Sequence, residues 1–187
     1  MHLECIVRQA EVCSQDTADG CMHKLWYNCA NCSASICGPT LVALGWHAWK
    51  TYLRLPEGHI ERHGAMMMLG ANLMIEDKYL DAQLAWRGVL SFRDEFDAYN
   101  IDCDSEFFPR QQLAYALTTN PAASDDDLLE AEALLKFELR QLRQEKVAQG
   151  FIEDAQELLD TTRREIRRRR RRPRAADASS SKATATR

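Results

Sequence analysis

One stretch decides the fold, and it reads Leu69-Gly70-Ala71-Asn72-Leu73-Met74-Ile75-Glu76-Asp77-Lys78-Tyr79-Leu80-Asp81-Ala82-Gln83-Leu84-Ala85-Trp86-Arg87-Gly88-Val89-Leu90. Leu69 and Leu73 are four residues apart, and Ala82 follows Leu69 by thirteen. Trp86 lies four residues after Ala82. Small residues at Gly70 and Ala82 let two antiparallel helices approach closely, while the large residues fill the groove between them. The spacing therefore predicts a helical hairpin packed through Leu69, Gly70, Leu73, Ala82 and Trp86.

This spacing resembles one tetratricopeptide repeat, a helical-hairpin motif of about 34 residues. A partial second match runs from Leu142 to Ala155, again thirteen residues apart. Ala82 and Ala155 are 73 residues apart, so the two matches do not share a 34-residue register. A plain helical bundle is the alternative architecture. The resemblance implies protein binding by analogy of fold alone.

Helical periodicity extends outward from this hairpin in both directions. Apolar residues recur at intervals of three and four, and glycine, proline or asparagine stands between the periodic segments. Ser124 is suited to cap a helix, and the three aspartates after it favour the positive end of the helix dipole. In the segment from 78 to 92 the apolar positions are Leu80, Leu84, Val89 and Leu90. We expect an all-α fold with helices over 41–55, 59–75, 78–92, 109–117, 124–149 and 151–166.

Six of the seven cysteines lie before residue 38. Cys29 and Cys32 form a Cys-x2-Cys pair, whose two thiolates can reach one tetrahedral zinc ion from a tight turn. An odd cysteine count and the absence of a secretory pattern argue against a disulfide framework. Unligated, reduced cysteines are the alternative. The sequence predicts a zinc site whose ligands come from Cys21, His23, Cys29, Cys32 and Cys37.

Charge is divided unevenly along the chain. Residues 163–187 hold eleven Lys/Arg and two acids, a net +9, whereas the other 162 residues hold 13 Lys/Arg and 26 acids, a net −13. Such asymmetry is typical of a basic tail with a partner of its own. The tail suits a nuclear-import signal or a phosphate contact, or it is a solvated end with no dedicated partner. The candidate contact residues are Arg167, Arg168, Arg169, Arg170, Arg171, Arg172 and Arg174.

These features divide the chain into a Cys-rich segment (1–38), a helical domain (39–166) and an Arg-rich disordered tail (167–187). No glycine-rich phosphate loop, nucleophile elbow or carboxylate pair with a plausible base is present, so we expect no enzymatic activity. No apolar run is long enough to cross a membrane. We predict a protein-protein adaptor of the nucleus or cytoplasm whose tail directs nuclear import. The alternative is a small nucleic-acid-binding regulator, a layout that resembles the small cysteine-rich proteins of some plant viruses.

Overall fold

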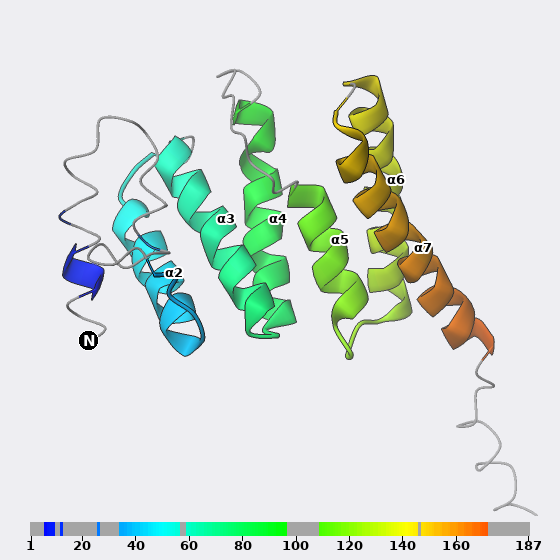
Figure 1. The fold of residues 1–187 in the computed structure, drawn as a ribbon, viewed down its shortest axis with the longest axis horizontal. Coiled ribbons are helices and arrows are strands. Elements are labelled where there is room, and N and C mark those ends of the chain that lie inside the picture. The colour runs from blue at the N-terminus through cyan, green and yellow to red at the C-terminus, as the bar shows by residue number, and fades with distance from the viewer. Residues whose placement is uncertain are drawn as a thin grey trace, which may run out of the picture.

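The computed structural model describes residues 6–9, 12, 26, 34–56, 59–96, 109–145 and 147–171, and for residues 60 and 92–96 it describes the backbone alone. Helices dominate this part of the chain (Figure 1), which confirms the predicted all-α fold. The longer helices are α2 (Pro39–Tyr52), α3 (Ile60–Ile75), α4 (Tyr79–Phe96), α5 (Pro109–Thr119), α6 (Asp125–Gln144) and α7 (Gln149–Arg171).

The helices follow one another across the molecule as a series of packed neighbours. Each of α2 to α6 packs against the helix that follows it in the chain, and α5 also packs against both α3 and α7. The alternate helices α3, α5 and α7 therefore lie in a row, while α4 packs against α3 and α5, and α6 packs against α5 and α7. This arrangement confirms the predicted antiparallel hairpins.

Helix ends follow the local chemistry of the sequence. Pro39 occupies the start of α2, where its missing N–H is not needed, directly after Gly38 with φ +68°. The α3–α4 turn is tight because Asp77 takes a left-handed conformation with φ 55°. The Lys78 N–H then donates to the Leu73 carbonyl at 2.9 Å, and the Asp77 N–H donates to that of Met74 at 3.1 Å. These bonds close the hairpin between the Leu69 and Ala82 positions.

The boundary between α6 and α7 differs from the prediction. α6 ends at Gln144 rather than 149, and the Val147 N–H donates to the Leu142 carbonyl at 3.2 Å. Gly150 does not break a helix but lies in the first turn of α7. Glycine is most unfavourable in a helix interior, so its position in the first turn costs α7 less.

We predicted a disordered tail from residue 167 onward, and this prediction is wrong for the first five residues of the tail, which are helical. α7 continues to Arg171, so the arginine run forms its last turns. Arginine favours helix formation, and cations are stabilised at a helix C-terminus. Glu165 adds ion pairs to Arg168 at 2.7 Å and to Arg169 at 3.0 Å across one helical turn. The rest of the tail, from 172 to 187, lies outside the described residues.

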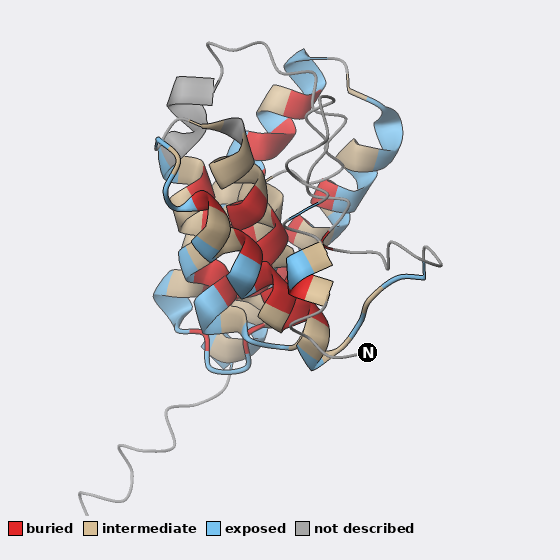
Figure 2. Ribbon diagram, turned by 90° about the vertical axis from the view of Figure 1, so that its left-hand side faces the viewer, coloured by how far each residue is buried: buried red, intermediate tan, exposed pale blue. Residues whose placement is uncertain are grey.

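Two groups of buried side chains form the core, on the helix faces that turn toward one another (Figure 2). The larger group joins α2 to α7 and includes Trp86, Leu117 and Leu135. The smaller group joins the N-terminal segment, α2 and α3, and includes Trp26 and Leu44. Polar contacts within the core also position the helices, since buried Asn72 on α3 donates to the Leu41 carbonyl on α2 at 3.0 Å.

Candidate interaction surfaces

The residues predicted to pack the hairpin lie together between α3 and α4. Leu69, Leu73, Ala82 and Trp86 are buried in the larger core group. Gly70 faces the Trp86 ring so closely that an added Cβ would lie 2.8 Å from its Cε2 atom. The glycine is thus required by the close approach of the two helices.

Leu80 and Leu84 lie on the opposite side of α4. Their side chains are 66% and 71% exposed, although they were among the apolar positions of the expected helix. The reason is the 100° turn per residue of a helix. Ala82, Trp86 and Val89 occupy the buried face, so a residue two positions before or after Ala82 points away from it. Ile75, the last residue of α3, is also 63% exposed.

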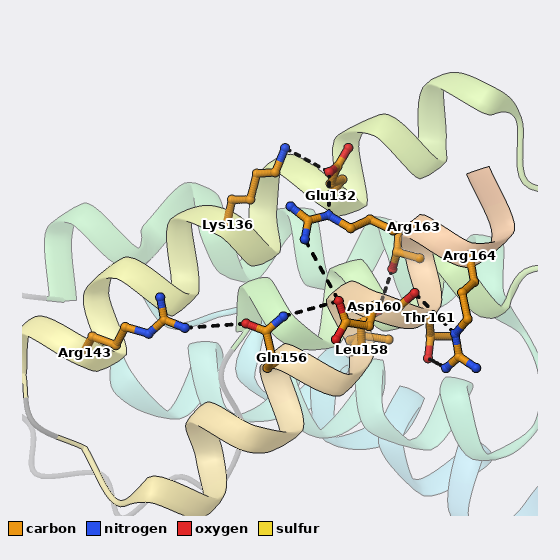
Figure 3. Close-up of polar contacts among 10 residues, drawn as sticks. Glu132, Lys136, Arg143, Gln156, Leu158, Asp160, Thr161, Arg163 and Arg164 are labelled. Carbon is orange, nitrogen blue, oxygen red and sulfur yellow. Dashed lines mark hydrogen bonds and ion pairs between the residues drawn. The ribbon is translucent and has the colours of Figure 1, made fainter. Parts of the chain in front are cut away.

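Arg163 and Arg169 attach the basic end of α7 to α6. The Arg163 Nε donates to Glu132 at 2.9 Å, and Glu132 also pairs with Lys136 at 2.9 Å (Figure 3). Arg169 donates to the Ala123 carbonyl and lies 3.7 Å from the Asp125 carboxylate at the start of α6. Lys136 and Arg163 lower the pKa of Glu132 by donating hydrogen bonds to it. The acidic helix α6 therefore neutralises part of the arginine cluster within the molecule.

The other arginines of α7 reach solvent. Arg164, Arg167, Arg168, Arg170 and Arg171 are exposed. Arg164 bonds only within its own helix, to the Thr161 hydroxyl at 2.9 Å and to the Asp160 carbonyl at 3.4 Å (Figure 3). Arg168 and Arg169 donate to Glu165 and lower the pKa of its carboxyl group. The structure thus separates the predicted contact arginines into Arg169, which pairs with α6, and others that reach solvent. From the sequence we predicted a single set, and this set did not include Arg163 and Arg164.

Most of the predicted zinc set falls outside the described residues. The structure does not describe Cys21, His23, Cys29 or Cys32. It describes Cys37, which is exposed. Within the described ranges, no three His, Cys, Asp or Glu side chains are grouped so that they could hold a metal ion. Zinc binding stays a prediction. Arg172 and Arg174, from the predicted contact set, also lie outside these ranges.

Comparisons with known proteins found no match to this chain. No protein-family model, no curated protein and no solved structure matches the chain. The tetratricopeptide resemblance therefore rests on the hairpin residues themselves. None of the helices in the described ranges is both long and apolar enough to span a membrane.

Proposed function

We propose that the protein is a non-enzymatic adaptor that binds a protein partner through the outer face of α4. The observation that carries this proposal is the pair Leu80 and Leu84, two large apolar side chains more exposed than any other on the described helices. Residues four apart on a helix are neighbours, so the pair forms one continuous apolar surface. Single exposed leucines are common on proteins, but paired ones held on a rigid helix favour a binding role.

The chemistry of the surface suggests the kind of partner. Leu80 and Leu84 lie one turn apart, which matches the interval between apolar side chains of an amphipathic helix. Asp81 is exposed and directly follows Leu80 on the helix, which provides a polar side chain at the rim. Such a combination of apolar centre and polar rim is the usual composition of a protein interface. The partner is therefore a segment with a leucine-sized apolar stripe.

The test compares two double variants in partner capture. Leu80→Ser/Leu84→Ser removes the proposed surface, and Leu53→Ser/Leu129→Ser removes two exposed leucines elsewhere. We expect the first to reduce the capture of specific partners at least tenfold, and the second to leave it within twofold. Capture is measured by quantitative mass spectrometry after nuclease treatment and chemical crosslinking, with helix content checked by circular dichroism. Equal capture by the two variants would contradict the proposal.

A further inference from the structure

α7 changes its charge halfway along its length. The exposed acidic residues Glu153, Asp154, Glu157 and Asp160 occupy its first half, and from residue 163 onward Glu165 is the only acid of the helix. This order agrees with the helix dipole, which favours acids at the N-terminus and bases at the C-terminus. Any contact with a polyanion is therefore confined to the last two turns, because the first half would repel it.

The side chains of these last turns point in two directions. Thr162 is buried, and Ile166 and Arg169 are half-buried, so these positions face the body of the molecule. With 100° per residue, Arg164, Arg168 and Arg171 lie within about 60° of one another on the opposite side, and Arg167 lies next to them. We name this surface the outer arginine face and define it as Arg164, Arg167, Arg168 and Arg171.

We propose that the outer arginine face binds the phosphate backbone of nucleic acid. A planar guanidinium donates two parallel hydrogen bonds to a phosphate, which a point charge cannot do. Arg164 and Arg171 are separated by about 10 Å along the helix axis. One nucleic-acid strand places a phosphate about every 3.4 Å along a duplex, so the face spans about three phosphates.

The density of charge favours nucleic acid over an acidic protein surface. Four guanidinium groups on one face of eight residues require a closely spaced row of anions, which a sugar-phosphate backbone supplies in any sequence. The helix is also held in place, since Arg163 and Arg169 form ion pairs with α6. The backbone of the outer face is therefore presented in a fixed geometry, and binding has to order only the arginine side chains. Glu165 pairs with Arg168 at 2.7 Å, which lowers the number of free charges to about three.

The experiment measures fluorescence anisotropy of the full chain with two labelled probes, a 24-nucleotide single-stranded RNA and a 24-base-pair DNA duplex. Salt is varied from 50 to 200 mM. The test variant is Arg164→Gln/Arg167→Gln/Arg171→Gln. The control is Arg54→Gln/Arg140→Gln/Arg143→Gln, which changes the net charge equally at exposed positions elsewhere.

We expect the wild type to bind at least one probe, with log affinity falling against log salt by a slope of about 3. The test variant should lose at least tenfold in affinity at 50 mM salt and lose most of the salt slope, because it removes the three arginines of the face that Glu165 does not pair. The control should stay within twofold of the wild type. Circular dichroism of each variant confirms that its helices are retained.

Three outcomes would overturn the proposal. The first is the absence of a complex between the wild type and either probe at 50 mM salt. The second is an equal loss in the test and control variants, which would indicate an effect of net charge alone. The third is full binding by the test variant together with loss in Arg172→Gln/Arg174→Gln. If neither probe binds and a purified import receptor binds the wild type but not the test variant, the face is an import signal instead.

Discussion

Gly70 has no side chain, and this allows α3 to approach the Trp86 ring on α4 closely. A Cβ at Gly70 would lie 2.8 to 3.1 Å from three atoms of the fully buried Trp86 ring. The ring cannot move aside, because it is surrounded by the larger core group. Gly64 lies on the same helix, and a Cβ there would meet nothing within 4 Å.

We therefore predict opposite effects for the same substitution at these two positions. Gly70→Ala should lower the free energy of unfolding by about 1–3 kcal/mol through overpacking. Gly64→Ala should raise it by about 0.5–1 kcal/mol, since alanine loses less backbone entropy in a helix interior. Urea denaturation followed by circular dichroism measures both. A stabilising effect of alanine at Gly70 would show that the two helices are not held at this distance.

Spacing in the sequence could predict which residues pack this hairpin, because apolar and small residues there repeat at helical intervals. It could not predict Glu138, which is 1% exposed on α6 with its carboxylate 3.5 Å from Arg110 on α5. Its spacing places it on the face of Leu135 and Leu142, but charged residues are rarely buried without a partner, and Arg110 is identified as that partner only once the packing of α5 is known. The exposure of Leu80 was missed for the converse reason, since hydrophobicity alone does not say which side of α4 meets the core.

At the scale of the element, α6 owes its start to a capping box. The Ser124 hydroxyl accepts the Asp127 N–H at 3.1 Å, and the Asp127 carboxylate accepts the Ser124 N–H at 2.7 Å. The Ser124 hydroxyl also donates to the Asp127 carboxylate at 2.8 Å, and the bonds from the Ser124 N–H and hydroxyl lower the pKa of Asp127 from its ordinary value of 3.8. A lowered pKa in the folded state means stabilisation that is present above about pH 4 and is lost as the pH falls through the folded value.

Asp127→Asn should accordingly reduce stability by about 1 kcal/mol at pH 7. The difference from the wild type should shrink as the pH falls below about 4, where the wild-type carboxylate takes up a proton. Denaturation at pH 7, 5 and 3 measures this difference. Asp126→Asn removes a neighbouring charge while leaving the capping box in place, so it should cost less. A difference between Asp127→Asn and the wild type that does not vary with pH would be inconsistent with this account.

The helix start capped by Ser124 could be predicted closely, whereas α2 begins at Pro39, two residues before the predicted start at 41. The end of α7 could not be predicted, because a run of arginines reads as a solvated tail when its partners are unknown. The helical conformation at the end of α7 is stabilised by ion pairs of Arg163 and Arg169. Their partners are Glu165 on α7 and Glu132 and Asp125 on α6. Glu132 lies 31 residues before Arg163, and Asp125 lies 44 residues before Arg169, so a local pattern does not reveal either partner on α6.

At the scale of the whole molecule, the helices are coupled mainly to their neighbours. Among the described helices α3 to α7, α2 packs against α3 alone. By contrast, α5 packs against α3, α4, α6 and α7. Arrays of this kind have stabilities close to a sum of units and nearest-neighbour interfaces. A cavity at one end should therefore act differently from a cavity in the middle.

Leu44 on α2 and Leu117 on α5 are both fully buried, so each replacement by alanine should cost about 2–5 kcal/mol in its own region. Leu44→Ala empties the smaller core group, and we expect faster amide hydrogen exchange in α2 and the facing turns of α3, with α5 to α7 unchanged. Leu117→Ala opens a cavity in the larger group on α5, which packs against four other helices, and exchange should rise from α3 through α7. Hydrogen exchange read by mass spectrometry distinguishes the two patterns. If Leu44→Ala instead raised exchange equally in all helices, the array would unfold as one cooperative unit, and the outer face of α4 and the outer arginine face of α7 would gain or lose their shape together.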